Sequence, residues 1–250
     1  MKGLETFRAH FAGAEHQYVL IGGAACDIVL SEAGLDARLT KDLDIVLCIE
    51  AIDNDFFERL WRFIEAGGYS ARERSSGVKE FYRFHKPSQP DYPYMLELFS
   101  RKPEGMDFPE GAVLTPMPAA DEIMSLSAIL LDENYYLLLQ AQRRIVDGVS
   151  VLDEKALIPF KARAHIDLRQ RKESGAAVSA EDVKKHRADV FRLAQLLPAD
   201  AAIALTVPVG ADFARFLDLV AGDADVPMFG GIALEEAIAR LRLAYGLAGS

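Results

Sequence analysis

Residues 20–47, LIGGAACDIVLSEAGLDARLTKDLDIVL, contain the pattern on which the fold prediction depends. The apolar run of residues 18–21 is closed by two glycines, which predicts a strand that runs into a tight turn. A helix is expected over residues 24–32, and the apolar, β-branched run of residues 43–49 predicts a second, buried strand. The segment therefore indicates an α/β domain.

The rest of the N-terminal half follows the same scheme. Helical spacing of apolar residues predicts helices over residues 4–16 and 54–66. A period of two predicts strands in EFYRFHK, residues 80–86, and in YMLELFS, residues 94–100. These strands would form a small sheet of mixed direction.

Beyond Pro116 the pattern is helical. Helices are predicted over residues 120–131, 134–146, 157–172, 180–197, 211–220 and 234–246. Residues 100–118 form the best candidate linker. We therefore expect an α/β (α+β) protein, with a small mixed-sheet domain over residues 1–115 and a helical domain over residues 116–250.

The composition is that of an ordinary globular protein. The chain has 28 Lys plus Arg against 38 Asp plus Glu, a formal net charge of -10, which excludes a general nucleic-acid coat. Cys26 and Cys48 lie in apolar runs and are expected to be buried thiols in a reducing compartment. The N-terminus lacks the apolar core of a signal peptide, and every apolar run is too short to span a membrane, so a cytoplasmic location is expected.

Two carboxylates and a glycine pair carry the chemistry of this chain. Asp42 and Asp44 are two apart in a strand, so their side chains point the same way, and a hard divalent cation such as Mg²⁺ or Mn²⁺ would relieve their repulsion. Gly22 and Gly23 allow close approach of a ligand, and the helix that follows offers N–H groups to a phosphate. Glu97 interrupts a second apolar strand and is expensive to bury without a cation. Each feature alone is common, but together they predict a metal and phosphate site.

The order G-G, R-x-T-x-D-x-D and a later acid on a strand resembles the nucleotidyltransferase superfamily, whose fold is shared with DNA polymerase beta. More narrowly, with the helical second half, the chain resembles the AbiEii-type nucleotidyltransferases, toxins of type IV toxin–antitoxin and abortive-infection systems. The resemblance covers residues 18–99 well. It extends more loosely to residue 197, on the Lys161 helix and on KKHRAD.

The resemblance implies a role for each matching residue. Asp42, Asp44 and Glu97 would hold two Mg²⁺ or Mn²⁺ ions, and Glu97 would also be a candidate base for the acceptor hydroxyl. The remaining positions would contact the nucleoside triphosphate: Gly22, Gly23, Arg38, Thr40, Lys161, Lys185 and Asp189. The chain departs from the family at Gly23, where a small hydroxyl residue is common, and at Glu97, where the family has Asp.

A local basic excess lies in the second half. Residues 161–192 contain nine Lys or Arg and five Asp or Glu. These charges are consistent with solvated helix faces, or with a surface that neutralises a triphosphate or grips RNA. Lys185 and Asp189 are also spaced as an i,i+4 pair.

The sequence thus predicts a metal-dependent transfer of a nucleoside monophosphate from an NTP to a hydroxyl of RNA or protein. A toxin role with an antitoxin partner follows from the resemblance. Two alternatives stay open. One is transfer to a small molecule, as in antibiotic-modifying relatives, and the other is a non-catalytic nucleotide-binding module.

Overall fold

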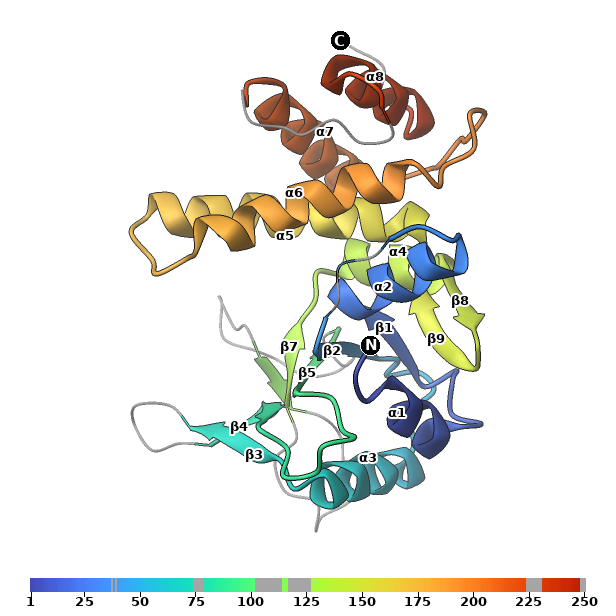
Figure 1. Ribbon diagram of the computed structural model, residues 1–250, viewed down its shortest axis with the longest axis vertical. Helices are drawn as coiled ribbons and strands as arrows, with labels where there is room; N and C mark the ends of the chain where they lie inside the picture. Colours follow the sequence, from blue (N-terminus) through green and yellow to red (C-terminus); the bar gives the residue numbers. More distant parts are fainter. Residues whose placement is uncertain are drawn as a thin grey trace. The chain divides into compact units, whose positions relative to one another are not determined.

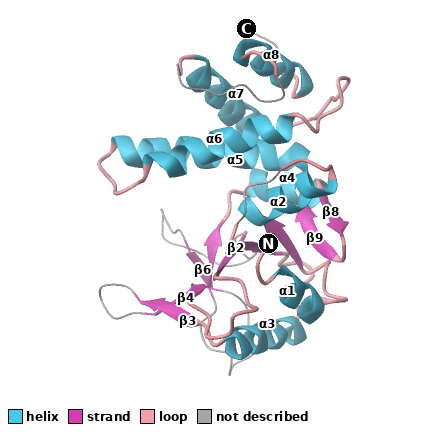
Figure 2. Ribbon diagram, in the orientation of Figure 1, coloured by secondary structure: helices cyan, strands magenta, loops and turns pink. Residues whose placement is uncertain are grey.

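The computed structural model describes residues 1–36, 38, 40–73, 79–101, 114–116, 127–223 and 231–247. The chain divides into two compact units (Figure 1). The first unit comprises Met1–Ser31 and Asp36–Leu152, and the second comprises Glu32–Leu35 and Asp153–Ser250. All of the described strands belong to the first unit, and the described regular elements of residues 153–250 are all helices (Figure 2). The predicted combination of a mixed α/β part and a helical part is confirmed.

The sheet of the first unit is mixed. Its strands follow the order β3-β4-β5-β2-β1-β9-β8, and β7 pairs with both β5 and β6. Strand β2 is antiparallel to β1 and parallel to β5, so the two strands that carry the predicted acids are direct neighbours. The strand bounds are β1 Tyr18–Ile21, β2 Asp42–Leu47, β3 Ser70–Glu73, β4 Lys79–His85, β5 Met95–Ser100, β6 Leu114–Pro116, β7 Ser127–Leu130, β8 Arg143–Val146 and β9 Val149–Leu152.

An aromatic core joins the sheet to two of the helices of this unit. Helices α1 and α3 lie side by side (Figure 1), with the Phe7 and Phe63 ring centroids 5.7 Å apart. Tyr18 of β1 packs edge-on against Phe7 at 5.2 Å. Burial of these large side chains is the main stabilising contribution. The helix bounds are α1 Leu4–Phe11, α2 Gly22–Glu32, α3 Asn54–Gly67 and α4 Glu133–Ala141.

The helix predicted over residues 134–146 is wrong in its second part. Helix α4 ends at Ala141, and β8 and β9 then form an antiparallel hairpin. Its two-residue turn is Asp147-Gly148, with φ of 48° and 72°. An Asp-Gly turn with two positive φ angles matches the twist of a hairpin, and this local signal outweighs the apolar period that favours a longer helix.

The helix predicted over residues 120–131 is also wrong where the structure describes it. Residues 117–126 lie outside the described part, and Ser127–Leu130 form strand β7. Strand β7 hydrogen-bonds in parallel to β5 and antiparallel to β6. A short apolar run suits a strand as well as a helix, and pairing with a sheet settles the choice.

The hairpin also shifts the division between the two parts of the chain. The predicted division lies at residues 115/116, whereas the chain divides between Leu152 and Asp153. The reason is that β9 pairs in parallel with β1, at Leu20 and Val151, and so extends the sheet far beyond the expected linker.

The second unit is a helical bundle built on an aromatic and aliphatic core. The Phe213 ring lies 4.8 Å from Tyr245 and is stacked on Phe216 at 6.1 Å. Helix α5 begins at Glu154, capped by Asp153, three residues before the predicted start at residue 157, and Lys161 lies inside the helix. The bounds are α5 Glu154–Glu173, α6 Ala180–Ala194, α7 Val207–Ala221 and α8 Leu234–Ala244. No described helix has both the length and the apolar character needed to cross a lipid bilayer.

Candidate functional site

One row of residues crosses four adjacent strands of the first unit. Ile21 of β1 is opposite Asp44 of β2, and Asp44 is in register with Glu97 of β5. Glu97 is in turn opposite Arg83 of β4. Side chains in register on neighbouring strands share one face of a sheet. The structure therefore places two of the three predicted acids side by side.

Asp42 joins Asp44 on this face, as the period of two predicts. Both aspartates are half-buried, whereas Leu43 between them is fully buried on the opposite side. The same alternation holds on β5, where Glu97 is half-buried between the buried Leu96 and Leu98. The apolar neighbours anchor each strand in the core, and the acids are left on the accessible face.

Gly22 brings the start of helix α2 against the Asp44 carboxylate. The sequence predicts a glycine turn before a helix that starts at Ala24, but the two glycines are the first two residues of α2 itself. Gly22 has φ +66°, and a Cβ there would lie 1.9 Å from Oδ2 of Asp44. Only glycine permits this contact. The positive end of the helix dipole then lies beside the carboxylate.

Thr40 occupies the space beside Gly23. A Cβ on Gly23 would lie 2.9 Å from the Thr40 Oγ1. The same oxygen accepts a 3.5 Å hydrogen bond from the backbone N–H of Asp42. A threonine hydroxyl thus lies beside Gly23 at the start of α2.

Arg83 is a site residue that the sequence pattern did not predict. Its Nε donates a 2.7 Å hydrogen bond to the Glu97 Oε1, and its Nη2 donates to the same oxygen. A signal was present in the sequence, because Arg83 stands between Tyr82 and Phe84 in an alternating strand. What the sequence does not contain is the register that sets Arg83 opposite Glu97.

The donors of this face match a hard divalent cation in kind. Asp42, Asp44 and Glu97 offer carboxylate oxygens, the ligands that Mg²⁺ and Mn²⁺ prefer. Among the described residues no group of three or more His, Cys, Asp or Glu is arranged to hold a metal ion. Glu97 is instead engaged by Arg83. Arg38, one of the residues predicted to contact the triphosphate, is solvent-exposed.

In the second unit the structure brings Lys161 and Asp189 together. Their side chains are only 4% exposed each, and Nζ lies 2.9 Å from Oδ2. The Oδ1 of Asp189 also lies 3.8 Å from the Nη1 of Arg192. Lys185 pairs with Asp182 and not with Asp189, so the i,i+4 pair considered above is not formed. Lys161 and Asp189 form a buried ion pair, and their predicted contact with a nucleotide stays a prediction.

Most of the cationic side chains of residues 161–192 are paired with carboxylates of the second unit, of which Asp212 and Asp223 lie outside this segment. Six of its nine cationic side chains have a carboxylate partner within 4.0 Å, namely Lys161, Arg163, Arg169, Lys185, Arg187 and Arg192. Paired charges contribute little to a long-range field. The pairing favours ordinary helix faces over an RNA-binding surface.

His165 is buried in the same unit, between its helices. Its Nδ1 is 3.0 Å from the carbonyl oxygen of Val183, and its ring packs edge-on against Phe216 at 5.3 Å. The Nε2 is buried and has no hydrogen-bond partner among the described residues. Burial lowers the pKa of His165 from 6.5, and the nearby Arg187 and Arg169 act in the same direction.

We expect His165 to make stability depend on pH. Below about pH 6.5 the unfolded chain binds a proton at this position. The folded chain, in which the pKa of His165 is lowered, does not yet bind it. The free energy of unfolding should therefore fall as the pH falls from about 6.5, with a slope approaching 1.4 kcal/mol per pH unit until the folded pKa is passed.

The measurement is urea unfolding of the full chain between pH 8 and pH 5, in wild type and His165→Asn. The asparagine keeps an N–H donor for the Val183 carbonyl but does not titrate. The wild-type free energy should drop more steeply than that of the variant. If the free energy of unfolding depended on pH identically in wild type and variant, His165 would bind its proton equally well in the folded and the unfolded chain.

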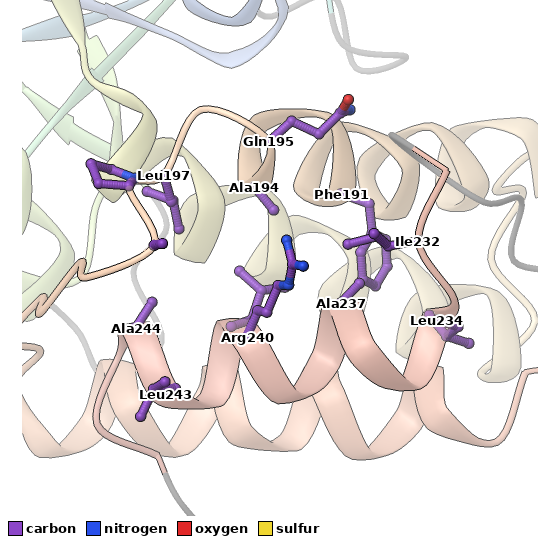
Figure 3. Close-up of a pocket in the computed structure, with 13 residues that line it drawn as sticks. Phe191, Ala194, Gln195, Leu197, Ile232, Leu234, Ala237, Arg240, Leu243 and Ala244 are labelled. Carbon is purple, nitrogen blue, oxygen red and sulfur yellow. The ribbon is translucent and has the colours of Figure 1, made fainter.

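A hollow in the second unit lies between α8 and the end of α6 (Figure 3). Its volume is about 520 Å³, and apolar side chains such as Phe191, Leu197 and Leu241 line it. Arg240 also lines it and is paired with Glu236 at 2.6 Å. None of the predicted site residues lines this hollow, so it has no part in the acidic face of β2 and β5.

No protein-family model matches the chain, and no curated protein matches it. Among solved structures it is similar to an antigenic nucleotidyltransferase-like protein from Paracoccidioides brasiliensis, with 14% identity and a TM-score of 0.47 over 95% of this chain and 93% of that one. It is also similar to JHP933 from Helicobacter pylori, with 14% identity and a TM-score of 0.39 over 98% of this chain and 89% of that one. Similarity at this level does not establish a function, which has to be inferred from the residues of the site.

Proposed function

We propose that the protein is a metal-dependent nucleotidyltransferase, which moves a nucleoside monophosphate from an NTP to a hydroxyl acceptor. The observation that carries the proposal is the contact between Gly22 at the start of α2 and the Asp44 carboxylate. This contact brings the start of α2, which would bind phosphate, next to Asp44, which would bind a metal ion. Asp42 on the same face and Glu97 in register complete the set of acids.

Each residue of the face has a role in this reaction. The N–H groups at Gly22 and Gly23 would bind the triphosphate, together with the Thr40 hydroxyl and Arg38. Two Mg²⁺ or Mn²⁺ ions, held by Asp42, Asp44 and Glu97, would neutralise phosphate charge and lower the pKa of the acceptor hydroxyl.

The chemistry is a substitution at the α-phosphorus. A bond forms between the acceptor oxygen and the α-phosphorus, the bond to the β-phosphate oxygen breaks, and pyrophosphate leaves. The hydroxyl proton passes to a carboxylate, for which Glu97 is the candidate. Positioning and charge neutralisation provide most of the rate enhancement in such transfers. Lys161 and Asp189 are left out of this scheme, because their charges are paired with each other.

For the acceptor we propose RNA or protein, and for the cellular role the toxin of a type IV toxin–antitoxin pair. Support comes from the resemblance of the G-G and R-x-T-x-D-x-D segments to AbiEii-type enzymes. Because many cationic side chains of residues 161–192 are paired with carboxylates, this segment is less suited to binding RNA than its sequence alone suggests. A small-molecule acceptor therefore belongs in the same experiment.

The test is incubation of the protein with each α-labelled NTP and Mg²⁺, with total RNA, a protein extract or an aminoglycoside as acceptor. EDTA and heat-inactivated protein are the controls. We expect label to move to one acceptor class, with release of pyrophosphate, and only without EDTA. Absence of transfer to all three classes, together with absence of metal-dependent NTP binding, would contradict the proposal.

Gly22→Ala is expected to lower the transfer rate by about 100-fold. The new Cβ would require the Asp44 carboxylate to move by more than 1 Å, and a displacement of that size costs about two orders of magnitude. The measurement is the initial rate of label transfer at saturating NTP.

Gly13→Ala is the matched control for this substitution. Gly13 has φ +83° and nothing within 4 Å of the position that a Cβ would take, so its alanine variant carries backbone strain without a clash. We expect the free energy of unfolding of Gly13→Ala to fall by about 1 kcal/mol, as backbone strain also lowers that of Gly22→Ala. The transfer rate of Gly13→Ala should equal that of the wild type. If Gly22→Ala transferred label as fast as Gly13→Ala, the position of Asp44 beside Gly22 would not matter for the reaction.

A further inference from the structure

Arg83 and Glu97 form an ion pair in the first unit. The two side chains face each other across the antiparallel strands β4 and β5, and they are 25% and 12% exposed. Both hydrogen bonds from the guanidinium run to the same carboxylate oxygen, Oε1. Arg83 therefore holds the third acid of the proposed site in the protein without ligands.

Charge explains why an arginine is useful at this position. Asp44 and Glu97 are in register on parallel strands, and neighbouring strands lie only about 4.8 Å apart. Two carboxylates at such a distance repel each other unless a positive charge is close. Arg83, next in the row, supplies that charge when no cation is bound.

A divalent cation would supply the same charge to the same carboxylates. We propose that Arg83 and the cation compete for Glu97, and that Arg83 yields this carboxylate when a nucleoside triphosphate binds and passes its guanidinium to the phosphates. A guanidinium suits this second partner, since its planar fork of N–H donors matches phosphate as well as carboxylate. The inference rests on the proposed function and adds to it a coupling between metal and nucleotide.

The coupling predicts that Arg83 has opposite effects on the affinity for the cation and on the affinity for the nucleotide. Arg83 weakens the binding of a cation alone, because the cation must first displace it. Arg83 strengthens the binding of the nucleotide, because the displaced guanidinium gains a partner. Loss of Arg83 should therefore tighten the first equilibrium and weaken the second. A variant that is merely misfolded would weaken both.

The experiment uses the full chain and Arg83→Gln. Mn²⁺ alone is titrated and followed by electron paramagnetic resonance, and the α,β-methylene analogues of ATP, GTP, CTP and UTP are then titrated at saturating Mn²⁺. We expect Mn²⁺ to bind Arg83→Gln about 10-fold more tightly than wild type. The preferred nucleotide analogue should bind about 10-fold more weakly.

Two further variants act as controls. Arg62→Gln removes a guanidinium from an exposed pair with Glu58 on α3 and should change neither affinity. Arg83→Lys keeps the charge without the fork, so Mn²⁺ affinity should stay near that of wild type while nucleotide affinity falls. Thermal unfolding of each variant verifies that it is folded.

The outcomes separate this inference from the proposed function. Opposite shifts in Arg83→Gln support the inference. If wild type binds Mn²⁺ with the analogue, but Arg83→Gln binds Mn²⁺ no more tightly than wild type, the inference is overturned and the proposed function stands. If wild type binds no analogue at any Mn²⁺ concentration, the proposed function is overturned and the inference with it.

Discussion

Asp44→Asn should reduce nucleotide transfer by roughly 10³-fold, equivalent to about 4 kcal/mol of transition-state stabilisation. Asparagine has nearly the same shape as aspartate, so it can keep the contact with Gly22 at the start of α2. It lacks the negative charge that the proposed metal site needs beside Glu97. The loss should therefore appear in the rate of transfer and in Mn²⁺ affinity, with little change in thermal unfolding.

Asp55→Asn is the matched control for this substitution. Asp55 is exposed in the first turn of α3, in the same unit, and has no part in the acidic face. Its variant should transfer label at the wild-type rate. Should Asp44→Asn be folded and equally active, Asp44 would hold no metal and the proposed function would lose its central residue.

Lys161→Met should lower the free energy of unfolding by about 3–5 kcal/mol, because it leaves the Asp189 carboxylate buried without its ammonium partner. The double variant Lys161→Met, Asp189→Leu removes both charges and should recover most of this loss. The measurement is urea unfolding of the full chain for the wild type, both single variants and the double variant. The coupling energy of this cycle isolates the pair.

Lys172→Met, in the last turn of α5, is the control for the loss of an exposed lysine from the same helix. It should change stability by less than about 0.5 kcal/mol. The cycle also distinguishes two roles of Lys161. Unchanged stability together with weaker NTP binding in Lys161→Met would show that Lys161 contacts the nucleotide, as the family resemblance implies. A large loss of stability that the double variant recovers assigns it to the helical core.

The elements that were predicted well are those whose signal is local. Strand β1, strand β2 and helix α3 all lie within a few residues of their predicted bounds. For α3 the reason is visible at both ends. The Asp53 carboxylate caps the first turn by accepting from the Phe56 N–H, and Gly68 ends the helix with φ +62°. The failures, β7 and β8, are short segments whose conformation depends on strand pairing.

The site divides along the same line. A period of two suffices to set Asp42 and Asp44 on one face, and an acid amid apolar neighbours suffices to single out Glu97. Both inferences use residues within one strand. The pairing of Glu97 with Arg83 spans a loop between strands, and the pairing of Lys161 with Asp189 spans two helices.

The amino-acid pattern alone was thus enough for the class of fold and for the placement of Asp42 and Asp44 on one face of a strand. It was not enough for the sheet order, for the partners of Glu97 and Lys161, or for the contact of Gly22 with Asp44. Periodicity and capping act over a few residues and are written in the local sequence. Strand register and ion pairing depend on which distant segments pack together, and this is decided by the free energy of the whole chain.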